Sequence, residues 1–385
     1  MSHDGVDLNI MESQSACDLL LHVQQWFDGY QLHNSPLQLA INEGTLVDCG
    51  PELNWHARRL IESDGILLPA VTDLHTHPDH YASRFGSDPD QNSLYTGVNQ
   101  VVSQGDAGAL GAKDFVNRVI NPCQTDVKLA INISKYGESR STASISSTED
   151  IDLDLCIAAG HQFATQIVAV SVNVSRNSCP QVDPKKVLKL AVRAAEELEL
   201  PILYGMRRNA DWPIGEQLRL LRPGDIVTYC FRPAPHSIAD ATGILLEICN
   251  ARHCGIVFDV GHGCQSFNFD VAEFAIKSGF MPDTISTDLQ CGHNGMQPPH
   301  TLALVASKMM AIGMPLNLVL RSITTRPVEV LGISNDKVFG YGIPANFQIV
   351  SLSGDNHVLT DCLGSQRIGK LIISEVVIQQ GEQIR

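Results

Sequence analysis

The chain has 385 residues and a formal net charge of −15, with 42 acidic against 27 basic residues. The acidic balance repels nucleic acid and anionic membrane surfaces, so neither is an expected partner, and it also helps to keep a protein soluble. Hydrophobic residues make up 44% and charged residues 18%, which is typical of soluble globular enzymes.

The 11 cysteines are scattered and include no CxxC pair, which argues against a disulfide framework and against a structural zinc knuckle. A reducing cytoplasm is therefore the expected location. Residues 1–17 lack the basic start and apolar run of a signal peptide. No stretch reaches the roughly 18 apolar residues that a membrane-spanning helix needs. Self-association into a homo-oligomer is left open.

Short strands are predicted at both ends of the chain, from alternating apolar residues bounded by turn signals. The N-terminal ones are Asp18–Val23, Leu37–Asn42, Thr45–Asp48 and Arg59–Glu62. The C-terminal ones are Asn346–Leu352, His357–Leu359 and Lys370–Gln379. We expect residues 1–64 and 335–385 to pair into one small β-sandwich domain.

From Gly65 onward, buried strand-like runs alternate with helical stretches. The predicted strands are Ile66–Val71, Val98–Ser103, Lys128–Ile133, Ile167–Val174, Ile202–Gly205, Ile226–Phe231, Gly255–Val260 and Thr284–Thr287. The predicted helices include Asp183–Leu198, Val271–Ser278, Leu302–Ile312 and Leu316–Thr324. About eight strands in such βαβ units predict an α/β fold with a closed (β/α)₈ TIM barrel over residues 65–334. An open doubly wound sheet is the alternative, but the Gly-rich phosphate turn that it would want after its first strand is absent.

The strongest local signal is the sequence Thr72-Asp73-Leu74-His75-Thr76-His77 at the end of the first predicted barrel strand. Residues two apart in a strand point the same way, so His75 and His77 project together. Barrel active sites lie at the C-terminal ends of the strands, and two imidazoles there make half of a metal site. A pair of exposed loop histidines is the alternative interpretation.

Asp288 follows the last predicted strand, which neighbours the first strand in a closed barrel. It is therefore expected to face His75 and His77, as a metal ligand and as an acceptor for a proton of water. A helix-capping role is the alternative. Near the end of the seventh strand, glycines flank His262, which is a candidate ligand, substrate donor or structural histidine, with Asp259 placed to orient it.

Three arginines follow the fifth and sixth predicted strands: Arg207, Arg208 and Arg232. A cluster of arginines at the functional face of an acidic protein predicts a carboxylate-bearing ligand. Ordinary solvated loop charges are the equal alternative.

The order of these features resembles the amidohydrolase superfamily, in particular its deacetylase and dihydroorotase-like branch. The resemblance covers nearly the whole chain. It rests on LLPAVTDLHTH from Leu67, VNQVVSQGDAG from Val98, PGDIVT from Pro223, DVGHG from Asp259, STDL from Ser286 and the pair Arg326-Pro327. The resemblance implies a metal-dependent hydrolase whose metal is held by His75, His77 and Asp288.

Members of this family usually hold a second metal through a carboxylated lysine and two further histidines. At the corresponding places this chain offers Ser171, Tyr204 or Gly205, and Tyr229. A mononuclear site is therefore expected. A neutral Tyr204 or Tyr229 suits a hydrogen-bond donor to a substrate oxygen, or plain packing.

Two functions are compatible with these residues. The first is hydrolysis of an amide, cyclic amide or acyl ester in a small, carboxylate-bearing substrate by a metal-activated water. The metal would be zinc, with manganese, iron or nickel as alternatives. Asp288, His262 and Tyr229 are the predicted catalytic residues. The predicted substrate contacts are Arg207, Arg208, Arg232 and Tyr204. The second function is a degenerate barrel that binds a small acidic ligand or a partner without turnover.

Overall fold

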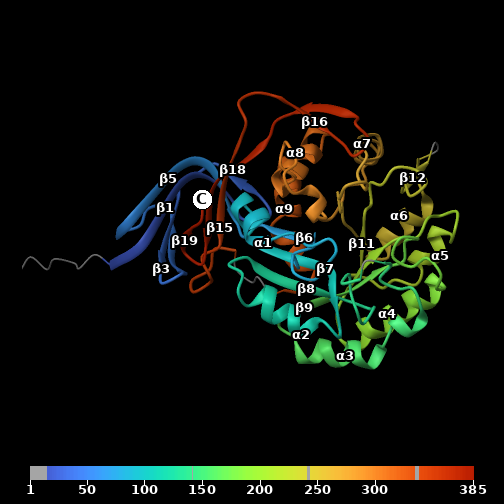
Figure 1. Ribbon diagram of the computed structural model, residues 1–385. Coiled ribbons are helices and arrows are strands. Elements are labelled where there is room, and N and C mark those ends of the chain that lie inside the picture. Colours follow the sequence, from blue (N-terminus) through green and yellow to red (C-terminus); the bar gives the residue numbers. More distant parts are fainter. Residues whose placement is uncertain (1–14, 141, 241–242, 334–337) are drawn as a thin grey trace, which may run out of the picture.

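The computed structural model describes residues 15–140, 142–240, 243–333 and 338–385. Two regions lie side by side in it (Figure 1). One is a body of strands from both ends of the chain, and the other is a ring of strands surrounded by helices. Among the described residues, none of the helices has the length and apolar character needed to cross a membrane.

The two chain ends join in one eight-stranded sheet with the order β19-β18-β15-β5-β1-β3-β4, in which β2 also pairs with β1. Its N-terminal strands are β1 (Ser15–Phe27), β2 (Leu32–His33), β3 (Leu37–Asn42), β4 (Thr45–Gly50) and β5 (Trp55–Pro69). Its C-terminal strands are β15 (Phe347–Leu352), β18 (Ile372–Gln379) and β19 (Glu382–Gln383). The predicted pairing of the two ends is confirmed, because β15 pairs antiparallel with β5.

This sheet curls around a core of its own. Leu39 and Ile41 of β3 belong to the same buried apolar cluster as Phe347 of β15 and Ile378 of β18. Thr45, at the far edge of the sheet, bridges to Pro344 just before β15. The sheet therefore folds back on itself and buries one face, as the prediction of a small sandwich required.

The predicted strand Ile66–Val71 is wrong as a barrel strand. Ile66 and Pro69 pair with Val350 and Phe347 of β15, so this run belongs to the terminal sheet. The run is apolar at every position because β5 leaves the exposed part of the sheet there and becomes buried. The domain boundary at residue 64 stays a prediction, and β5 crosses it without a break.

Among the described residues, the barrel contains seven parallel strands in the order β14-β11-β10-β9-β8-β7-β6. Their bounds are β6 (Thr72–Thr76), β7 (Gln100–Gly108), β8 (Asp126–Asn132), β9 (Ile167–Asn173), β10 (Ile202–Gly205), β11 (Ile226–Thr228) and β14 (Val257–Phe258). Segment 284–289 takes the eighth place. It bridges in parallel to Asp259 beyond β14 through Thr284 and to Thr76 of β6 through Leu289. The fold is thus the predicted (β/α)₈ type.

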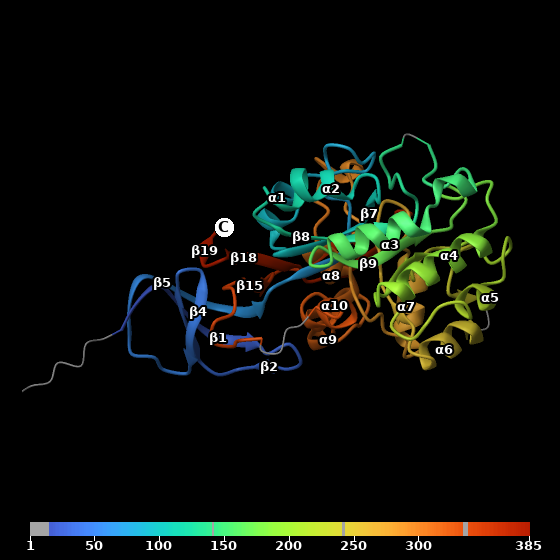
Figure 2. The ribbon, with the colours of Figure 1, turned by 90° about the horizontal axis from the view of Figure 1, so that it is seen from below.

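Helices surround the barrel on its outer side (Figure 2). They are α1 (Pro89–Asn92), α2 (Ala112–Phe115), α3 (Leu153–Gln162), α4 (Pro184–Glu197), α5 (Ile214–Leu218), α6 (Leu246–His253), α7 (Phe269–Lys277), α8 (Leu302–Ala311), α9 (Leu316–Ser322) and α10 (Thr325–Val330). Helix α4 is the clearest in the sequence, because Asp183 caps its N-terminus, Pro184 starts it and its apolar residues at helical spacing are buried. Single turns lie at Leu94–Thr96, Val116–Ile120, Thr148–Asp150 and Cys291–His293.

A hairpin near the C-terminus separates from the terminal sheet. Its strands β16 (His357–Thr360) and β17 (Gln366–Gly369) pair with each other in a sheet of two. Figure 1 shows this hairpin crossing above α8, at the barrel. The assignment of His357–Leu359 to the small β domain is therefore wrong. A second short pair is β12 (Ala239–Asp240) with β13 (Gly243–Ile244).

Candidate metal centre

The ends of β6 and of segment 284–289 bring His75, His77 and Asp288 together. One ligand atom from each lies within 4.8 Å of the others, and all three side chains are buried. Nε2 of His75 and Nε2 of His77 are each 3.3 Å from Oδ1 of Asp288. Among the described residues, this is the group of His, Cys, Asp or Glu side chains arranged to share a metal ion.

Closure of the barrel accounts for this geometry. The Asp288 amide donates to the His75 carbonyl at 2.8 Å, and the His77 amide donates to the Leu289 carbonyl at 2.9 Å. These two bonds place Asp288 between the two histidines. The predicted convergence of His75, His77 and Asp288 is thus a direct result of strand adjacency.

Both imidazoles are oriented through Nδ1. His75 Nδ1–H donates to Thr228 Oγ1 at 2.9 Å, and Thr228 in turn donates to Asp259 at 2.7 Å. His77 Nδ1–H donates to Asp106 Oδ1 at 2.7 Å. A proton on Nδ1 leaves the Nε2 lone pair free for a metal, which is the usual arrangement of histidine ligands.

Buried carboxylates give the site a negative field. Burial alone would lower the pKa of both histidines, but Asp288 and Asp259 raise the pKa of His75 to about 9. Asp106 and Asp288 raise the pKa of His77 to about 10. Burial opposes ionisation of Asp288, yet the two imidazoles hold its pKa well below the usual range. The site therefore favours positive charge at its centre, as a divalent cation would supply.

Two residues at the site have a left-handed backbone that side chains rarely adopt. Asp288 has φ +49° and Tyr229 has φ +68°. Two glycines make room for the side chains around them. A Cβ on Gly263 would lie 2.4 Å from Asp288 Oδ2, and a Cβ on Gly261 would lie 2.2 Å from Thr228 Oγ1. These glycines, which flank His262 in sequence, thus leave the space that Asp288 and Thr228 occupy at the metal group.

Tyr229 lies directly beside the metal group, and Arg232 packs on Tyr229. The Tyr229 hydroxyl is 3.4 Å from His75 Nε2, and burial raises the pKa of this phenol well above its usual value. The Arg232 guanidinium stacks on the Tyr229 ring at 3.8 Å and donates to Ser266. Arg232 makes no ion pair with a carboxylate among the described residues. It lines a cavity of about 580 Å³ together with Arg176 and Arg208.

Three predicted substrate contacts are engaged elsewhere. Arg207 is buried and donates to the carbonyls of Val174 and Cys179. Arg208 forms an ion pair with Asp211 at 2.9 Å, although it also lines the Arg232 cavity. Tyr204 is fully buried on the outer side of β10, where its hydroxyl donates to Gln217. The structure therefore places Arg232 against Tyr229, which contacts the metal group, and keeps Tyr204 and Arg207 away.

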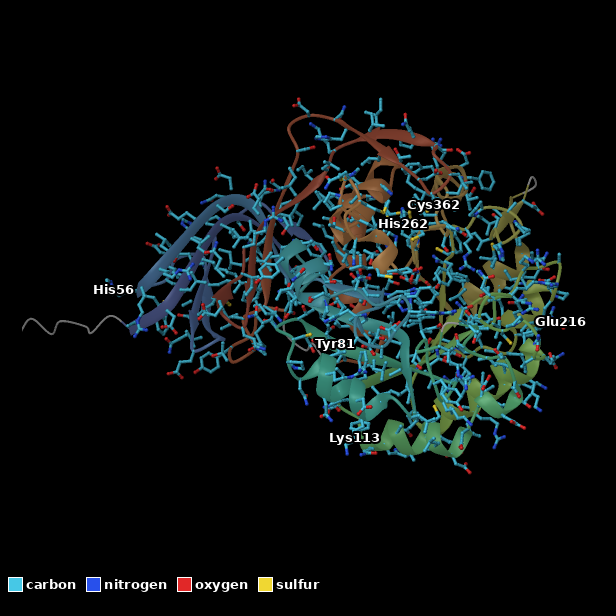
Figure 3. The ribbon with its side chains drawn as sticks, viewed as in Figure 1. His56, Tyr81, Lys113, Glu216, His262 and Cys362 are labelled. Atoms are coloured by element: carbon cyan, nitrogen blue, oxygen red, sulfur yellow. The ribbon has the colours of Figure 1, made fainter. Side chains whose placement is uncertain are left out.

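His262 faces away from the metal group. Its Nε2 accepts a hydrogen bond from Lys308 at 2.8 Å, its Nδ1–H donates to the Gly263 carbonyl, and its ring stacks on Phe267. In Figure 3, His262 lies close to Cys362 of the C-terminal hairpin. The prediction that Asp259 orients His262 is wrong, because Asp259 accepts hydrogen bonds from Thr228, Thr284 and Ser286.

Sequence reasoning missed Asp106 and Thr228 as partners of the ligands. Both lie at strand ends, and Ser103 and Ser83 also donate to Asp106. Their positions near the end of β7 and at the end of β11 were the available signal, since histidine ligands usually donate their other ring N–H to a nearby oxygen. Gln290, whose amide donates to Asp288 Oδ1 at 2.9 Å, carried no comparable signal.

Comparisons with known proteins show similarity along nearly the whole chain. A deacetylase of Brucella anthropi is 29% identical over 352 residues, which covers 89% of this chain and 86% of that protein. A deacetylase of Agrobacterium fabrum is 29% identical over 331 residues, covering 84% and 80% of the two chains. No family model matches the sequence.

Solved structures agree with the fold. The crystal structure of a dihydroorotase superposes with a TM-score of 0.85 at 27% identity, covering 95% of this chain and 97% of that one. The crystal structure of an adenine deaminase gives a TM-score of 0.86 at 24% identity, covering 95% and 99%, and supports the shared fold.

Proposed function

Because this chain is a hydrolase of the amidohydrolase superfamily, we propose that it cleaves an amide, cyclic amide or acyl ester bond with water activated by one divalent metal at His75, His77 and Asp288. The observation that carries the proposal is the pair of Nε2 atoms aimed at one carboxylate oxygen, 3.3 Å from each, with both Nδ1 atoms already engaged. Three protein ligands leave a coordination position open, as catalytic sites require.

The donor set fits a metal. Two neutral imidazoles and one carboxylate are ligands that zinc accepts, and manganese, iron or nickel also accept them. The field of Asp106, Asp259 and Asp288, which raises the pKa of both histidines, favours a cation there. When bound, a divalent metal supplies Lewis-acid activation of water and of a carbonyl oxygen.

The chain's own residues provide the remaining chemistry. Asp288 turns Oδ1 to the imidazoles and Oδ2 toward Gly263, and we assign to Oδ2 the acceptance of a proton from water and its transfer to the leaving group. The raised pKa of Tyr229 keeps its hydroxyl protonated, which suits donation to a substrate carbonyl oxygen. Arg232 offers a guanidinium without a carboxylate partner among the described residues, and we assign it to a substrate carboxylate.

We propose a single metal because of the residues at the other strand ends. Ser171 and Tyr229 occupy places where a second metal would need stronger ligands, and Tyr204 faces the outer helices. In the described part of the chain, His75, His77 and Asp288 make up the candidate metal group. Cytoplasmic location and self-association stay predictions. The deacetylase names of the relatives favour acyl amides as the first substrates to test.

The test is hydrolysis by protein that has been depleted of metal and then titrated with zinc or manganese. N-acetyl amino acids, acetyl esters and five- or six-membered cyclic amides are the substrates. We expect activity to return and to saturate near one metal per chain. The control is Asp154→Asn, which removes an exposed carboxylate on α3, and its activity and metal requirement should match those of the parent. Activity that is unchanged by metal removal, or no hydrolysis in any substrate class after metal addition, would reject the proposal.

A further inference from the structure

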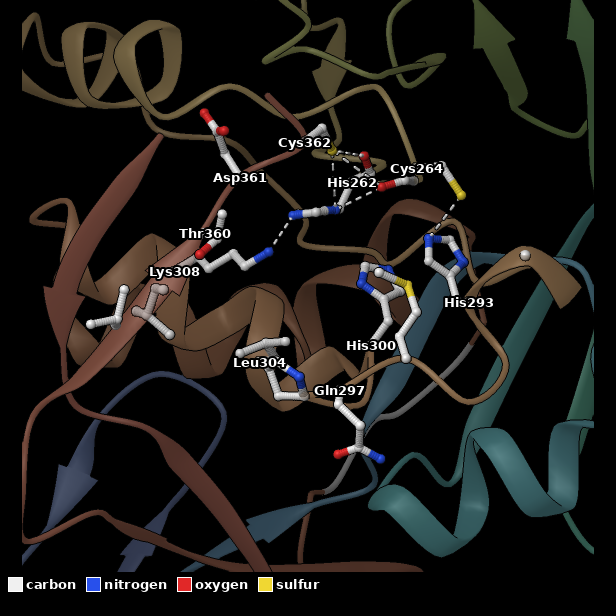
Figure 4. A pocket seen from close by; sticks show the side chains of 16 residues that line it. His262, Cys264, His293, Gln297, His300, Leu304, Lys308, Thr360, Asp361 and Cys362 are labelled. Carbon is white, nitrogen blue, oxygen red and sulfur yellow. Dashed lines mark hydrogen bonds between the residues drawn. The ribbon is translucent and has the colours of Figure 1, made fainter. Parts of the chain in front are cut away.

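A second cavity, of about 490 Å³, lies on the other side of the loop that carries His262 and Gly263. Figure 4 shows it between α8, the loop after segment 284–289 and the C-terminal hairpin. Cys362 lines both this cavity and the cavity of Arg232, so the hairpin loop separates the two. The volume is within the range of small-molecule pockets, about 300–1,000 Å³.

The cavity contains a buried lysine without an ion pair. Lys308 is 5% exposed, and its Nζ donates to Nε2 of His262 at 2.8 Å (Figure 4). His262 must be the acceptor, because its Nδ1–H already donates to the Gly263 carbonyl. Within the described residues, Lys308 forms no salt bridge. An ammonium group has three donors, so two remain for a ligand.

Asp361 is a carboxylate whose charge acts on Lys308, but its oxygens are occupied by other donors. Oδ1 accepts from the amides of Leu363 and Ser365. Oδ2 accepts from the amide of Phe269 and the side chain of Asn268. Asp361 therefore holds the hairpin against α7 and does not pair directly with Lys308.

The other titratable groups that face Lys308 carry no negative charge. Burial raises the pKa of the Cys264 and Cys362 thiols, which keeps both protonated. Burial also lowers the pKa of His293, and it lowers the pKa of His300 to about 3. These imidazoles are neutral. Asp361 is the other charged group of the lining, and its oxygens are filled by four neutral donors, whereas two N–H groups of the Lys308 ammonium remain open to an acceptor such as a carboxylate.

The rest of the wall is mostly apolar, with Gln297 and Thr360 as polar residues in it. Leu304 and Leu359 line the cavity, with Pro298 beside them, and Met296 and Val358 are exposed at its rim. A ligand with one negative end and a short hydrocarbon body matches these walls. A dianion such as phosphate matches the cavity less well, because Lys308 would neutralise only one of its two negative charges.

We propose that this cavity binds a small monocarboxylate with an apolar tail, whose carboxylate accepts hydrogen bonds from Lys308. The site is distinct from the metal group. The backbone at Gly263 contacts Asp288 on one side, while the His262 side chain faces Lys308 on the other. The inference goes beyond the proposed hydrolysis and does not depend on it.

The experiment measures binding of hexanoate, hexanamide and inorganic phosphate by calorimetry and NMR titration. Parent protein is compared with Lys308→Met, with Lys308→Arg and with Lys277→Met, an exposed lysine on α7. We expect hexanoate to bind the parent and Lys277→Met equally. Lys308→Met should weaken binding about tenfold or more, as loss of a charge-assisted hydrogen bond predicts. Lys308→Arg should retain part of the affinity.

Asp288→Asn separates the two sites. Hexanoate binding should persist in Asp288→Asn, while Lys308→Met should keep its bound metal. Equal binding of hexanoate and hexanamide would overturn the proposal, as would undiminished binding by Lys308→Met. Loss of hexanoate binding in Asp288→Asn would mean that the ligand sits at the metal group. Tighter binding of phosphate than of hexanoate would reject the monocarboxylate.

Discussion

Two groups of buried histidines lie at the same end of the barrel, and their surroundings are opposite in charge. His75 and His77 face carboxylates, which raise the pKa of both. His262, His293 and His300 face Lys308 and one another, and burial first, then these neighbours, lowers the pKa of His262 and His300.

The difference shows that residue type alone does not define a histidine site. The first group converges on a carboxylate and suits a cation, whereas in the second His262 accepts a hydrogen bond from the Lys308 ammonium, beside the cavity that we assign to an anion. The boundary between them is a single loop, since Gly263 abuts Asp288 while His262 binds Lys308. Variants that alter one side of this loop should leave the other intact.

The largest effect is expected from Asp288→Asn. The amide keeps the size of the side chain but removes the negative charge that faces both Nε2 atoms. Hydrolysis should fall at least about a thousandfold, because the metal and the proton acceptor are lost together. Steady-state kinetics with the best acyl substrate provide the measurement, and activity within tenfold of the parent would exclude Asp288 from both roles.

Gly263→Ala should disrupt the metal group from the side of the loop. Its Cβ would lie 2.4 Å from Asp288 Oδ2, so the carboxylate must move. The matched control is Gly279→Ala, which has a similar left-handed backbone, φ +81°, but open space around it. Both variants suffer backbone strain, and only Gly263→Ala should lose metal affinity, about 10–100-fold by competition with a chelating dye. Equal affinities would show that the contact does not position Asp288.

Arg232→Met tests how the substrate is recognised. The guanidinium stacks on Tyr229 and has no ion pair with a described residue. For substrates with a carboxylate, KM should rise about tenfold or more, as expected for a lost charge-assisted hydrogen bond. For an uncharged acetyl ester, KM should change little. A similar increase in KM for both substrates would mean that Arg232 positions Tyr229 and does not bind the substrate carboxylate.

The smallest effect concerns stability at the Lys308 side. Burial lowers the pKa of Lys308 to about 8, below the value of about 10.4 expected in the unfolded chain. Between these two pH values the unfolded state binds more protons than the folded state, so the stability of the parent rises from pH 8 to about 10.4. Below pH 8 the full cost of burying a charged Lys308 is present. At pH 7 the free energy of unfolding of Lys308→Met should exceed that of the parent by about 1–2 kcal/mol, a figure that includes the loss of the His262 hydrogen bond. Denaturant titrations at pH 7 and 10.5 measure this. The stability gained by Lys308→Met should shrink at pH 10.5. A gain that is constant with pH would contradict the lowered pKa of Lys308.

The fold and the metal group were accessible from sequence for a physical reason. The period of two in a strand fixes the common direction of His75 and His77, and closure of the barrel places Asp288 beside them. The periodicity and the Asp183 cap likewise predicted α4. The prediction for Ile66–Val71 was wrong because a buried strand in the barrel and one in the terminal sheet are both apolar at every position. Only the pairing with β15 shows that this run belongs to the terminal sheet.

The remaining site residues depend on loop conformation, which the sequence does not encode in a simple period. His262 turns toward Lys308 because the left-handed glycines beside it redirect the chain. Tyr204 points outward because it alternates with Leu203, which is buried inside the barrel. Lys308 carried no signal, since a lysine on a helix is usually exposed and only the hairpin above α8 buries it.

The most direct test of the single-metal centre is the metal content per chain, measured by elemental analysis on protein purified without chelator. We predict about one divalent metal in the parent and in Lys308→Met, and none in Asp288→Asn. About two metals per chain, or none in the parent even after zinc or manganese is supplied, would contradict the single-metal centre at His75, His77 and Asp288.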